Sequence, residues 1–177
     1  MIPFLIVAAC IKLDSRGPIF FLQSRMGSRG KLFKVIKFRS MVDRHSQTVG
    51  ARESSMTLFD DTRITRVGSI LRRYRIDELP QIFNVLRGEM SWIGPRPEAL
   101  NLSRWYQAEL PFYQYRHIVK PGITGWAQVN QGHVVDLNDV HDKLRFDFYY
   151  IKYFSPWLDM LIAIRTLRII VGGFGAK

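Results

Sequence analysis

The alternation of apolar and polar residues predicts a small sheet near the N-terminus, followed mostly by helices. Two β-prone runs, residues 19–23 and 32–39, flank a Gly-Ser-Arg-Gly turn, which is typical of a β-hairpin. In the second run neither alternating set of side chains is purely apolar, so we expect a short, half-exposed strand. Residues 89–93 are expected to form a further short extended segment.

Apolar residues at helical spacing dominate the rest of the chain. The spacing predicts helices over residues 62–74, 77–87, 98–115, 139–153 and 157–171. The third of these should break near Pro111, and Ser155 and Pro156 suit the N-cap and first position of the last one. We therefore expect an α+β fold that is mostly helical and contains a small β-hairpin.

Residues 45–59 interrupt this pattern. They are polar, rich in Ser and Thr, and close with Asp60 and Asp61. Long loops in compact domains often serve as lids over a binding site, so we expect a loop of that kind here.

The first residues form an apolar run that ends at Lys12. The run is too short to span a bilayer as a helix, which needs about 20 apolar residues. Its end, V-A-A-C, looks like a lipoprotein cleavage box with Cys10 as the acylated residue, but no basic segment precedes it and the apolar stretch is short for a signal peptide. From these residues alone, a helix buried in the core explains the run as well as a membrane segment does.

Composition limits the classes of function. With 177 residues and 47% hydrophobic content, the chain can form one domain with a real core, which excludes global disorder. The net charge is +11, of which residues 1–88 carry +9, so an anionic partner is indicated: nucleic acid, acidic lipid or a phosphorylated substrate. Cys10 is the only cysteine, which excludes an intrachain disulfide and a thiolate metal cage.

The most informative stretch begins at Arg72. Three arginines (Arg72, Arg73 and Arg75) are followed at once by two carboxylates, Asp77 and Glu78. Helix N-termini attract phosphate, and arginine clusters bind it bidentately. A carboxylate placed there can attack a phosphorus atom whose charge its neighbours partly neutralise.

A helix is expected to begin at this carboxylate pair. Asp77 is a good N-cap, and Pro80 falls in the first turn, where its missing N–H costs nothing. Gly88 ends the helical pattern, where glycine is common. The apolar residues in between form a stripe that should face the core: Leu79, Ile82, Phe83 and Leu86. The alternative to a reactive role is that Asp77 is only a helix cap.

The string D-E-L-P-Q-I-F-N-V-L-R-G-E-M-S-W-I-G-P-R-P, residues 77–97, closely resembles the core of the bacterial sugar transferases. These are the monotopic polyprenyl-phosphate phosphoglycosyl transferases. Three further stretches resemble the family in the same order: K-F-R-S-M, K-P-G-I-T-G-W-A-Q-V-N and D-F-Y-Y. The resemblance extends from Pro3 to about Thr166.

The resemblance implies an enzyme. It would transfer a phospho-sugar from a UDP-sugar to polyprenyl (undecaprenyl) phosphate, releasing UMP, as the first membrane-bound step of exopolysaccharide, capsule, O-antigen or glycoconjugate biosynthesis. Asp77 would attack the sugar-bearing phosphate and form a covalent intermediate. Glu78 would help to bind Mg²⁺ or deprotonate the acceptor, and both carboxylates are candidate metal ligands.

The same resemblance implies roles for nearby basic residues. Lys37 and Arg39 would lie at the rim of the active site. Arg72 would lie near the phosphates, and the G-P-R-P motif would contribute to nucleotide-sugar binding. The complete set of expected substrate-binding residues is Lys37, Arg39, Arg72, Pro95, Arg96 and Pro97. Since each proline fixes its own φ, Pro95 and Pro97 should hold Arg96 rigidly.

The resemblance also implies a place for the chain in the cell. Residues 1–12 would be the second arm of a membrane hairpin that enters and leaves by one leaflet, with Pro3 near the bend and the first arm missing. Residues 13–177 would form the catalytic domain at the cytoplasmic face of the bacterial inner membrane. The last helix is too polar to span and suits the membrane interface or packing on the domain. Membrane lipids are therefore expected partners, beside the UDP-sugar and the polyprenyl phosphate.

Two other classes of function compete with this one. A nucleic-acid-binding module would explain the charge and the aromatic residues, but not the acidic pair inside a basic cluster, and the sequence has no helix-turn-helix, RNP or zinc pattern. A non-catalytic, membrane-associated scaffold of the same family is the stronger alternative, since a chain without half its hairpin could keep the fold and lose turnover.

Overall fold

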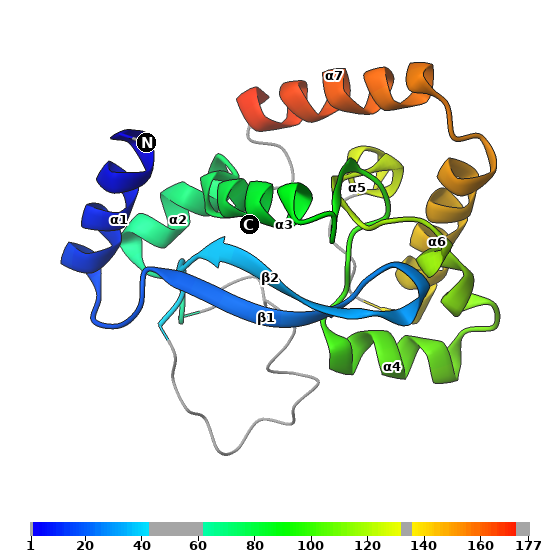
Figure 1. Ribbon diagram of the computed structural model, residues 1–177, viewed down its shortest axis with the longest axis horizontal. Coiled ribbons are helices and arrows are strands. Elements are labelled where there is room, and N and C mark those ends of the chain that lie inside the picture. The colour runs from blue at the N-terminus through cyan, green and yellow to red at the C-terminus, as the bar shows by residue number, and fades with distance from the viewer. Residues whose placement is uncertain (1, 43–61, 132–135, 173–177) are drawn as a thin grey trace.

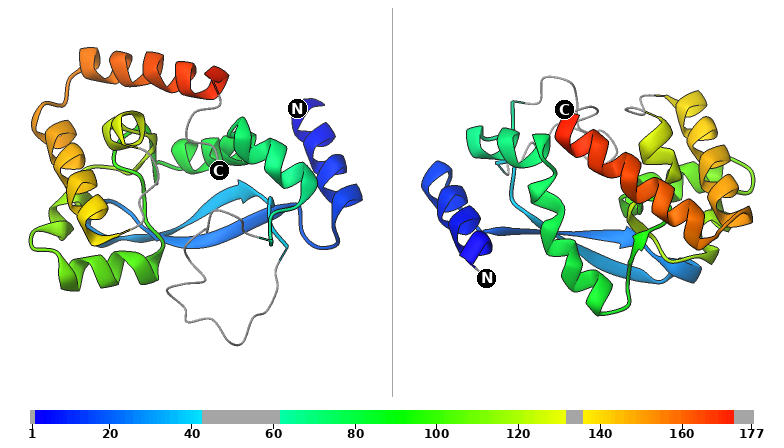
Figure 2. Two further views of the ribbon diagram at one scale, coloured as in Figure 1. Left: turned by 180° about the vertical axis from the view of Figure 1, so that it is seen from behind. Right: turned by 90° about the horizontal axis from the view of Figure 1, so that it is seen from above.

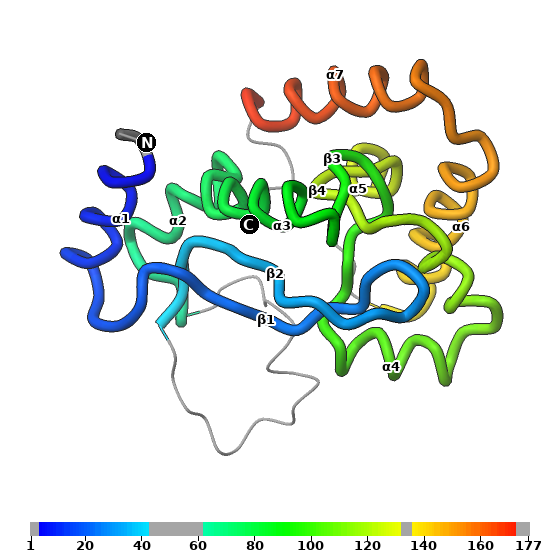
Figure 3. The backbone as a smooth tube through the Cα atoms, viewed as in Figure 1, coloured from blue at the N-terminus to red at the C-terminus, as the bar shows by residue number. Residues whose placement is uncertain are grey.

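The computed structural model describes residues 2–42, 62–131 and 136–172. The predicted loop over residues 45–59, with Asp60 and Asp61, lies outside the described residues. Figures 1 and 3 show the order of the elements, where η denotes a 3-10 helix: α1 (Ile2–Asp14), β1 (Phe20–Met26), η1 (Ser28–Gly30), β2 (Leu32–Phe38), α2 (Arg66–Arg73), η3 (Ile76–Gln81), α3 (Ile82–Leu86), β3 (Ser91–Ile93), α4 (Leu100–Glu109), η4 (Tyr113–Ile118), β4 (Gly122–Thr124), α5 (Trp126–Asn130), α6 (Leu137–Lys152) and α7 (Pro156–Gly172). The predicted class, α+β and mostly helical, is confirmed.

A β-hairpin runs through the middle of the molecule. Strands β1 and β2 pair antiparallel, from Phe20 opposite Phe38 to Met26 opposite Leu32, so the predicted hairpin is confirmed. Exposed and buried side chains alternate at the start of β2, as expected for a half-exposed strand. In Figure 1 the helices α2, α3 and α7 lie on one side of the hairpin and α4 lies on the other, and Figure 2 shows α1 and α6 at opposite ends of the molecule.

A second, very small sheet joins two segments that are distant in the sequence. Strands β3 and β4 pair parallel, with Ser91 opposite Gly122 and Ile93 opposite Thr124. Glycine is required for this close approach, because a Cβ on Gly122 would lie 2.2 Å from the backbone N of Gly94. The extended segment at 89–93 was predicted from the sequence, but its parallel partner was not. The pairing brings the G-P-R-P and K-P-G-I-T-G motifs together.

Most predicted helices are present, with shifted ends. Helix α6 begins at Asp136, whose side chain forms a reciprocal capping box with Asp139. Helix α7 begins as predicted, since the backbone N of Leu158 donates to Ser155 Oγ over 3.2 Å. Helix α2 is shorter than expected, because Thr65 caps it by accepting a hydrogen bond from the backbone N of Gly68.

The prediction that a helix begins with Asp77 as its N-cap is wrong in detail. The chain first forms the 3-10 helix η3, whose N-cap is Arg75 with a left-handed backbone (φ 54°), and only then enters α3. Gly88 does end the pattern, with φ 74°. A 3-10 helix has three residues per turn, whereas the predicted spacing assumed 3.6. The side chains of this segment therefore point in other directions than an α-helix would give them.

Three of the four residues of the stripe predicted to face the core face outward instead, and the fourth, Ile82, is partly buried. Leu79, Phe83 and Leu86 are 51, 44 and 76% exposed. The buried residues of the same segment are polar, apart from Pro80: Asp77, Glu78, Gln81 and Asn84. Their burial is possible because β2 and the neighbouring segments supply charged and hydrogen-bonding partners for the acidic and amide side chains.

Helix α1 packs against α2 and β2 with one side only. Ile11 is 2% exposed and packs with Phe38 and Leu71, whereas Leu5 and Ile6 are 65 and 59% exposed. The helix is therefore neither fully buried nor free of the domain. Across the described residues, no helix has the length and apolar character needed to cross a bilayer.

Candidate active site

The carboxylates of Asp77 and Glu78 are both buried, at 7 and 6% exposure. They lie on η3, which packs against β2, so Lys37 near the end of that strand reaches Glu78. Arg75 precedes the pair in a left-handed conformation, which is costly for a residue with a Cβ and persists only where the surrounding structure holds it.

Glu78 is held by two cations. Its Oε1 atom accepts a hydrogen bond from Lys37 Nζ at 3.0 Å and contacts Arg96 Nη2, while Oε2 accepts from Arg96 Nη1 at 3.3 Å. The guanidinium thus spans both carboxylate oxygens, the arrangement in which arginine also binds phosphate. Burial alone would raise the pKa of Glu78, but Arg96 and Lys37 outweigh it and hold the pKa well below its usual range.

Asp77 lies in a different environment although it is the next residue. Within the described residues its carboxylate accepts no hydrogen bond. Burial raises its pKa, and the charge of Glu78 adds to this effect, against the opposing influence of Lys37, Arg72 and Arg96. Asp77 is therefore the member of the pair whose oxygens are not committed to a cation.

The P-R-P segment is fixed by its carbonyl groups. Pro95 O accepts from the backbone N of Gly122 at 3.0 Å, and Pro97 O accepts from Arg25 Nη1 at 2.7 Å. Burial, together with repulsion from Arg96, lowers the pKa of Arg25 to about 10. Arg25 is thus a further, half-buried cation beside the site.

Comparison with known proteins gives the same assignment as the motifs. The sequence profile described as Bacterial sugar transferase matches residues 1–173. The chain belongs to the bacterial sugar transferase family. It is similar to the UDP-N-acetylgalactosamine-undecaprenyl-phosphate N-acetylgalactosaminephosphotransferase of Aeromonas hydrophila, with 52% identity over 173 residues that cover 98% of this chain and 40% of that protein.

Two other relatives differ in length. The undecaprenyl-phosphate glucose phosphotransferase of Komagataeibacter xylinus is 47% identical over 168 residues, which cover 92% of this chain and 31% of that protein. The exopolysaccharide production protein PSS of Rhizobium leguminosarum bv. phaseoli is 42% identical over 171 residues, which cover 93% of this chain and 84% of that protein. This bacterial sugar transferase chain therefore spans less than half the length of the first two relatives and most of the third.

The structure brings together only part of the predicted substrate-binding set. Lys37 and Arg96 meet at Glu78, and the flanking Pro95 and Pro97 fix the backbone of Arg96. Arg72, at the end of α2, influences Asp77 through its charge and donates to the sulfur of Met41 at 3.6 Å.

Arg39 lies elsewhere. Its Nη2 atom donates to the carbonyl groups of Ile11 and Ser15, at 3.3 and 2.6 Å, and to Ser15 Oγ at 2.8 Å. These acceptors lie at the C-terminal end of α1, where a cation also interacts favourably with the helix dipole. The structure thus joins Arg39 to α1 rather than to the carboxylate pair.

Sequence reasoning missed Asn84, which is fully buried. Its side chain accepts from the backbone N of Ile36 at 3.0 Å and donates to Lys34 O at 2.8 Å and to Glu89 Oε2 at 2.7 Å. The amide therefore bonds to the edge of β2 as a neighbouring strand would, and it holds η3 and α3 against the strand that carries Lys37. The signal in the sequence was a polar residue between two apolar ones, on the face opposite the assumed core.

The site offers few protein ligands for a metal ion. Within the described residues there is no group of three or more His, Cys, Asp or Glu side chains arranged to hold one. The Asp77 carboxylate fits Mg²⁺, which commonly binds to one or two carboxylates and takes its other ligands from phosphates and water. Glu78 could bind the same ion only after giving up a contact with Lys37 or Arg96.

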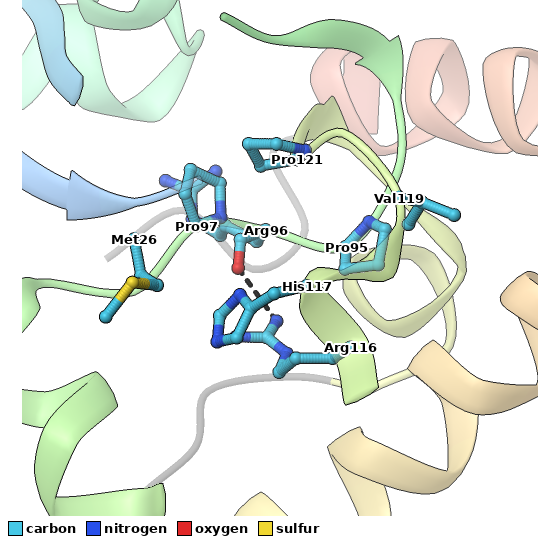
Figure 4. A pocket seen from close by; sticks show the side chains of 8 residues that line it. All are labelled: Met26, Pro95, Arg96, Pro97, Arg116, His117, Val119 and Pro121. Atoms are coloured by element: carbon cyan, nitrogen blue, oxygen red, sulfur yellow. Dashed lines mark hydrogen bonds between the residues drawn. The ribbon is translucent and has the colours of Figure 1, made fainter. Parts of the chain in front are cut away.

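A shallow pocket lies beside the site, behind the P-R-P segment (Figure 4). The side chains that line it are Met26, Pro95, Arg96, Pro97, Arg116, His117, Val119 and Pro121. Burial and the charge of Arg116 lower the pKa of His117 to about 4. His117 is thus neutral at physiological pH, and it adds no charge to a region already rich in cations.

Proposed function

We propose that this chain catalyses the transfer of a sugar phosphate from a UDP-sugar to a polyprenyl phosphate such as undecaprenyl phosphate, with release of UMP. The observation that carries the proposal is the buried pair of Asp77 and Glu78, in which Glu78 is paired with Lys37 and Arg96 and Asp77 is not. Membership of the bacterial sugar transferase family supports the class of reaction, and the names of the relatives supply donors and acceptor of this kind.

In the first step, an oxygen of Asp77 attacks the sugar-bearing phosphorus of the donor. A bond forms between this oxygen and phosphorus, the bond from phosphorus to the bridging oxygen breaks, and UMP leaves with the electron pair. The product is an aspartyl-phospho-sugar on the enzyme. Lys37 and Arg96 provide the positive charge that offsets the charge of the diphosphate.

In the second step, a phosphate oxygen of the polyprenyl phosphate attacks the same phosphorus atom. The bond to Asp77 breaks, which restores the carboxylate and gives the lipid-linked sugar diphosphate. Glu78 organises Lys37 and Arg96 for both steps. When one of these cations moves onto a phosphate, the pKa of Glu78 rises, and Glu78 then accepts a proton from the acceptor.

We also propose Mg²⁺ as the cofactor, with Asp77 as its protein ligand. The ion neutralises charge on the diphosphate and on the leaving phosphate when it is bound. The residues of the chain itself orient the donor: Lys37 and Arg96 from one side and Arg72, at the end of α2, from another.

We also propose that the chain acts at the cytoplasmic face of the inner membrane, because its proposed acceptor is a lipid. Exposed apolar side chains support it: Leu5 and Ile6 on α1, Leu79, Phe83 and Leu86 on η3 and α3, and Trp157, Leu167 and Val171 on α7. In Figure 1 α3 and α7 lie on the same side of the hairpin. Exposed apolar surface of this kind is a common mark of a membrane contact.

The direct test is intact-protein mass spectrometry after incubation with Mg²⁺ and a panel of UDP-sugars, without lipid acceptor. The panel includes UDP-N-acetylgalactosamine, which the name of the Aeromonas hydrophila relative contains, and UDP-glucose, which suits the glucose phosphotransferase of Komagataeibacter xylinus. We expect a mass increase of one sugar phosphate with the correct donor and none in Asp77→Asn. Addition of polyprenyl phosphate should then remove the adduct.

The alternative, a non-catalytic membrane-associated scaffold, makes the opposite prediction. Folded protein would bind vesicles but form no adduct with any donor and release no UMP. An adduct that persists in Asp77→Asn would show that another residue is the nucleophile.

A further inference from the structure

In the P-R-P segment, the backbone carbonyl groups of three consecutive residues accept hydrogen bonds. Because Pro95 and Pro97 have no N–H, the segment is fixed mainly through these acceptors. Each carbonyl receives a hydrogen bond from a different element: Pro95 O from β4, Arg96 O from η4 and Pro97 O from β1. The middle bond, from Arg116 Nη2 to Arg96 O over 2.8 Å, is the dashed line in Figure 4.

Arg116 is itself rigidly held. Its Nε and Nη2 atoms lie 2.9 and 2.7 Å from Asp147 Oδ2, and Nη1 donates to the hydroxyl of Tyr113 at 3.0 Å. All three residues are almost completely buried, with 3% exposure for Arg116, 2% for Asp147 and 1% for Tyr113. The guanidinium also lies 5.2 Å from the centre of the Tyr113 ring.

The remaining hydrogen bond of Arg116 reaches a residue of the proposed active site. Arg96 binds both oxygens of Glu78, so a shift of its backbone would move the guanidinium relative to the carboxylate pair. We propose that Arg116, oriented by Asp147 and Tyr113, is a positioning residue that holds Arg96 for contact with the diphosphate of the donor. This inference rests on the proposed function, because it takes that diphosphate as the ligand of Arg96.

A purely structural role explains the arrangement less well. A buried ion pair is weak evidence for stability, since replacing both partners by apolar residues of similar size is often neutral or stabilising. The pair between Arg116 and Asp147 neutralises its own charge, so it adds little to the positive potential at Glu78. What the pair supplies to the site is a fixed donor for the carbonyl of Arg96.

The test replaces the whole pair, so that no charge is left buried and unpaired. The variant Arg116→Met with Asp147→Leu is compared with the unchanged chain for its affinity for UDP, measured by titration calorimetry. The same comparison is made in an Arg96→Ala background. Thermal unfolding is recorded for all four proteins, and Arg145→Gln, which removes one charge of an exposed pair on α6, serves as the matched control.

We expect the pair replacement to weaken UDP binding about tenfold, as the loss of a hydrogen bond from a charged group would. In the Arg96→Ala background it should cause no further loss, because the effect acts through Arg96. The control should bind UDP like the unchanged chain. If the pair replacement does not fold, Arg116→Lys, which keeps the charge but not the planar fork, takes its place with the same expectation.

Two results would overturn the inference. One is unchanged UDP affinity in the pair replacement. The other is an equal loss with and without Arg96, which would assign the network to general stability. A chain that binds no UDP before any substitution would refute the proposed function itself and the inference with it, and this outcome is distinguishable because it needs no variant.

Discussion

At the scale of the residue, two neighbouring carboxylates have opposite electrostatic environments. The cations Lys37 and Arg96 lower the pKa of Glu78 well below its usual value, whereas burial and the charge of Glu78 raise the pKa of Asp77. Pairs of titratable groups with divergent pKa values are typical of active sites. Here the divergence indicates one carboxylate that organises cations and one that remains available to react.

Asp77→Asn should therefore abolish the covalent adduct and stabilise the fold. A raised pKa means that the folded state disfavours the charged carboxylate, so this destabilisation grows as the pH rises through the pKa of Asp77. We expect the melting temperature of Asp77→Asn to exceed that of the unchanged chain at pH 7 to 8, with a difference that shrinks toward acid pH. Asp142→Asn, at an exposed residue, is the control. A lower melting temperature at pH 7 would contradict the assigned pKa direction.

His117 should lower the free energy of unfolding in weak acid. Its pKa is lowered from 6.5 to about 4, first by burial and then by Arg116, so the folded state favours the neutral ring. The stability that depends on the neutral ring is complete above pH 6.5 and is lost as the pH falls toward 4. We expect His117→Gln to lose less stability than the unchanged chain between these pH values in denaturant titrations. His141→Gln, at an exposed position, should behave like the unchanged chain, and parallel curves for all three proteins would refute the prediction.

At the scale of the element, the segment of η3 and α3 buries its polar side against β2. The Asn84 side chain donates to Lys34 O and accepts from the backbone N of Ile36, and these two bonds take the place of a third strand. The pairing of Glu78 with Lys37 lies on the same interface. This contact fixes the distance between the strand that carries Lys37 and the helix that carries the carboxylates.

Replacing Asn84 by alanine should affect both the fold and the site. It would leave the backbone N of Ile36 and the carbonyl of Lys34 without their buried partner, at a cost of roughly 2–4 kcal/mol in the free energy of unfolding. UDP affinity should also fall, because Lys37 is no longer held against η3. Urea unfolding and calorimetry measure the two effects. Asn101→Ala, on the exposed side of α4, is the matched control, and a loss no larger than in that control would contradict the role.

At the scale of the whole molecule, many large apolar side chains are exposed on the helices, beside a smaller number on the strands. Among the described residues, the buried apolar side chains form four separate clusters instead of one large core. Leu79, Phe83 and Leu86 lie outside all of them. This distribution agrees with the proposal that the helical side of the hairpin contacts a lipid surface.

That proposal can be tested by vesicle co-sedimentation. Replacing Leu79, Phe83 and Leu86 by serine should reduce binding to vesicles of anionic phospholipid at least tenfold, since each exposed apolar side chain of this size contributes about 1–2 kcal/mol when it leaves water. The melting temperature should change little, because all three side chains are exposed and only Phe83 makes a ring contact, with Phe4. Leu32→Ser, at an exposed residue of β2, is the control. Equal binding by the triple variant and the control would exclude this helix as part of the membrane contact.

The sequence by itself determined the local structure and the candidate chemistry. The hairpin, the glycine end at Gly88 and the Ser155 cap were predictable because each depends on residues close together in the chain. The motif around Asp77 and Glu78 was sufficient to name the carboxylates and Arg96, because the spacing of residues in a motif needs no knowledge of the fold.

Tertiary structure alone decided what those residues contact. Pairing between β3 and β4, the bond from Arg116 to Arg96, and the attachment of Arg39 to α1 all join residues far apart in sequence. The exposure of Leu79 and Phe83 also depends on the tertiary structure. An apolar stripe in the sequence shows that one side of a helix is apolar, but not whether that side packs against the core. Here the buried side is the polar one, because strand β2 and its cations stabilise it there.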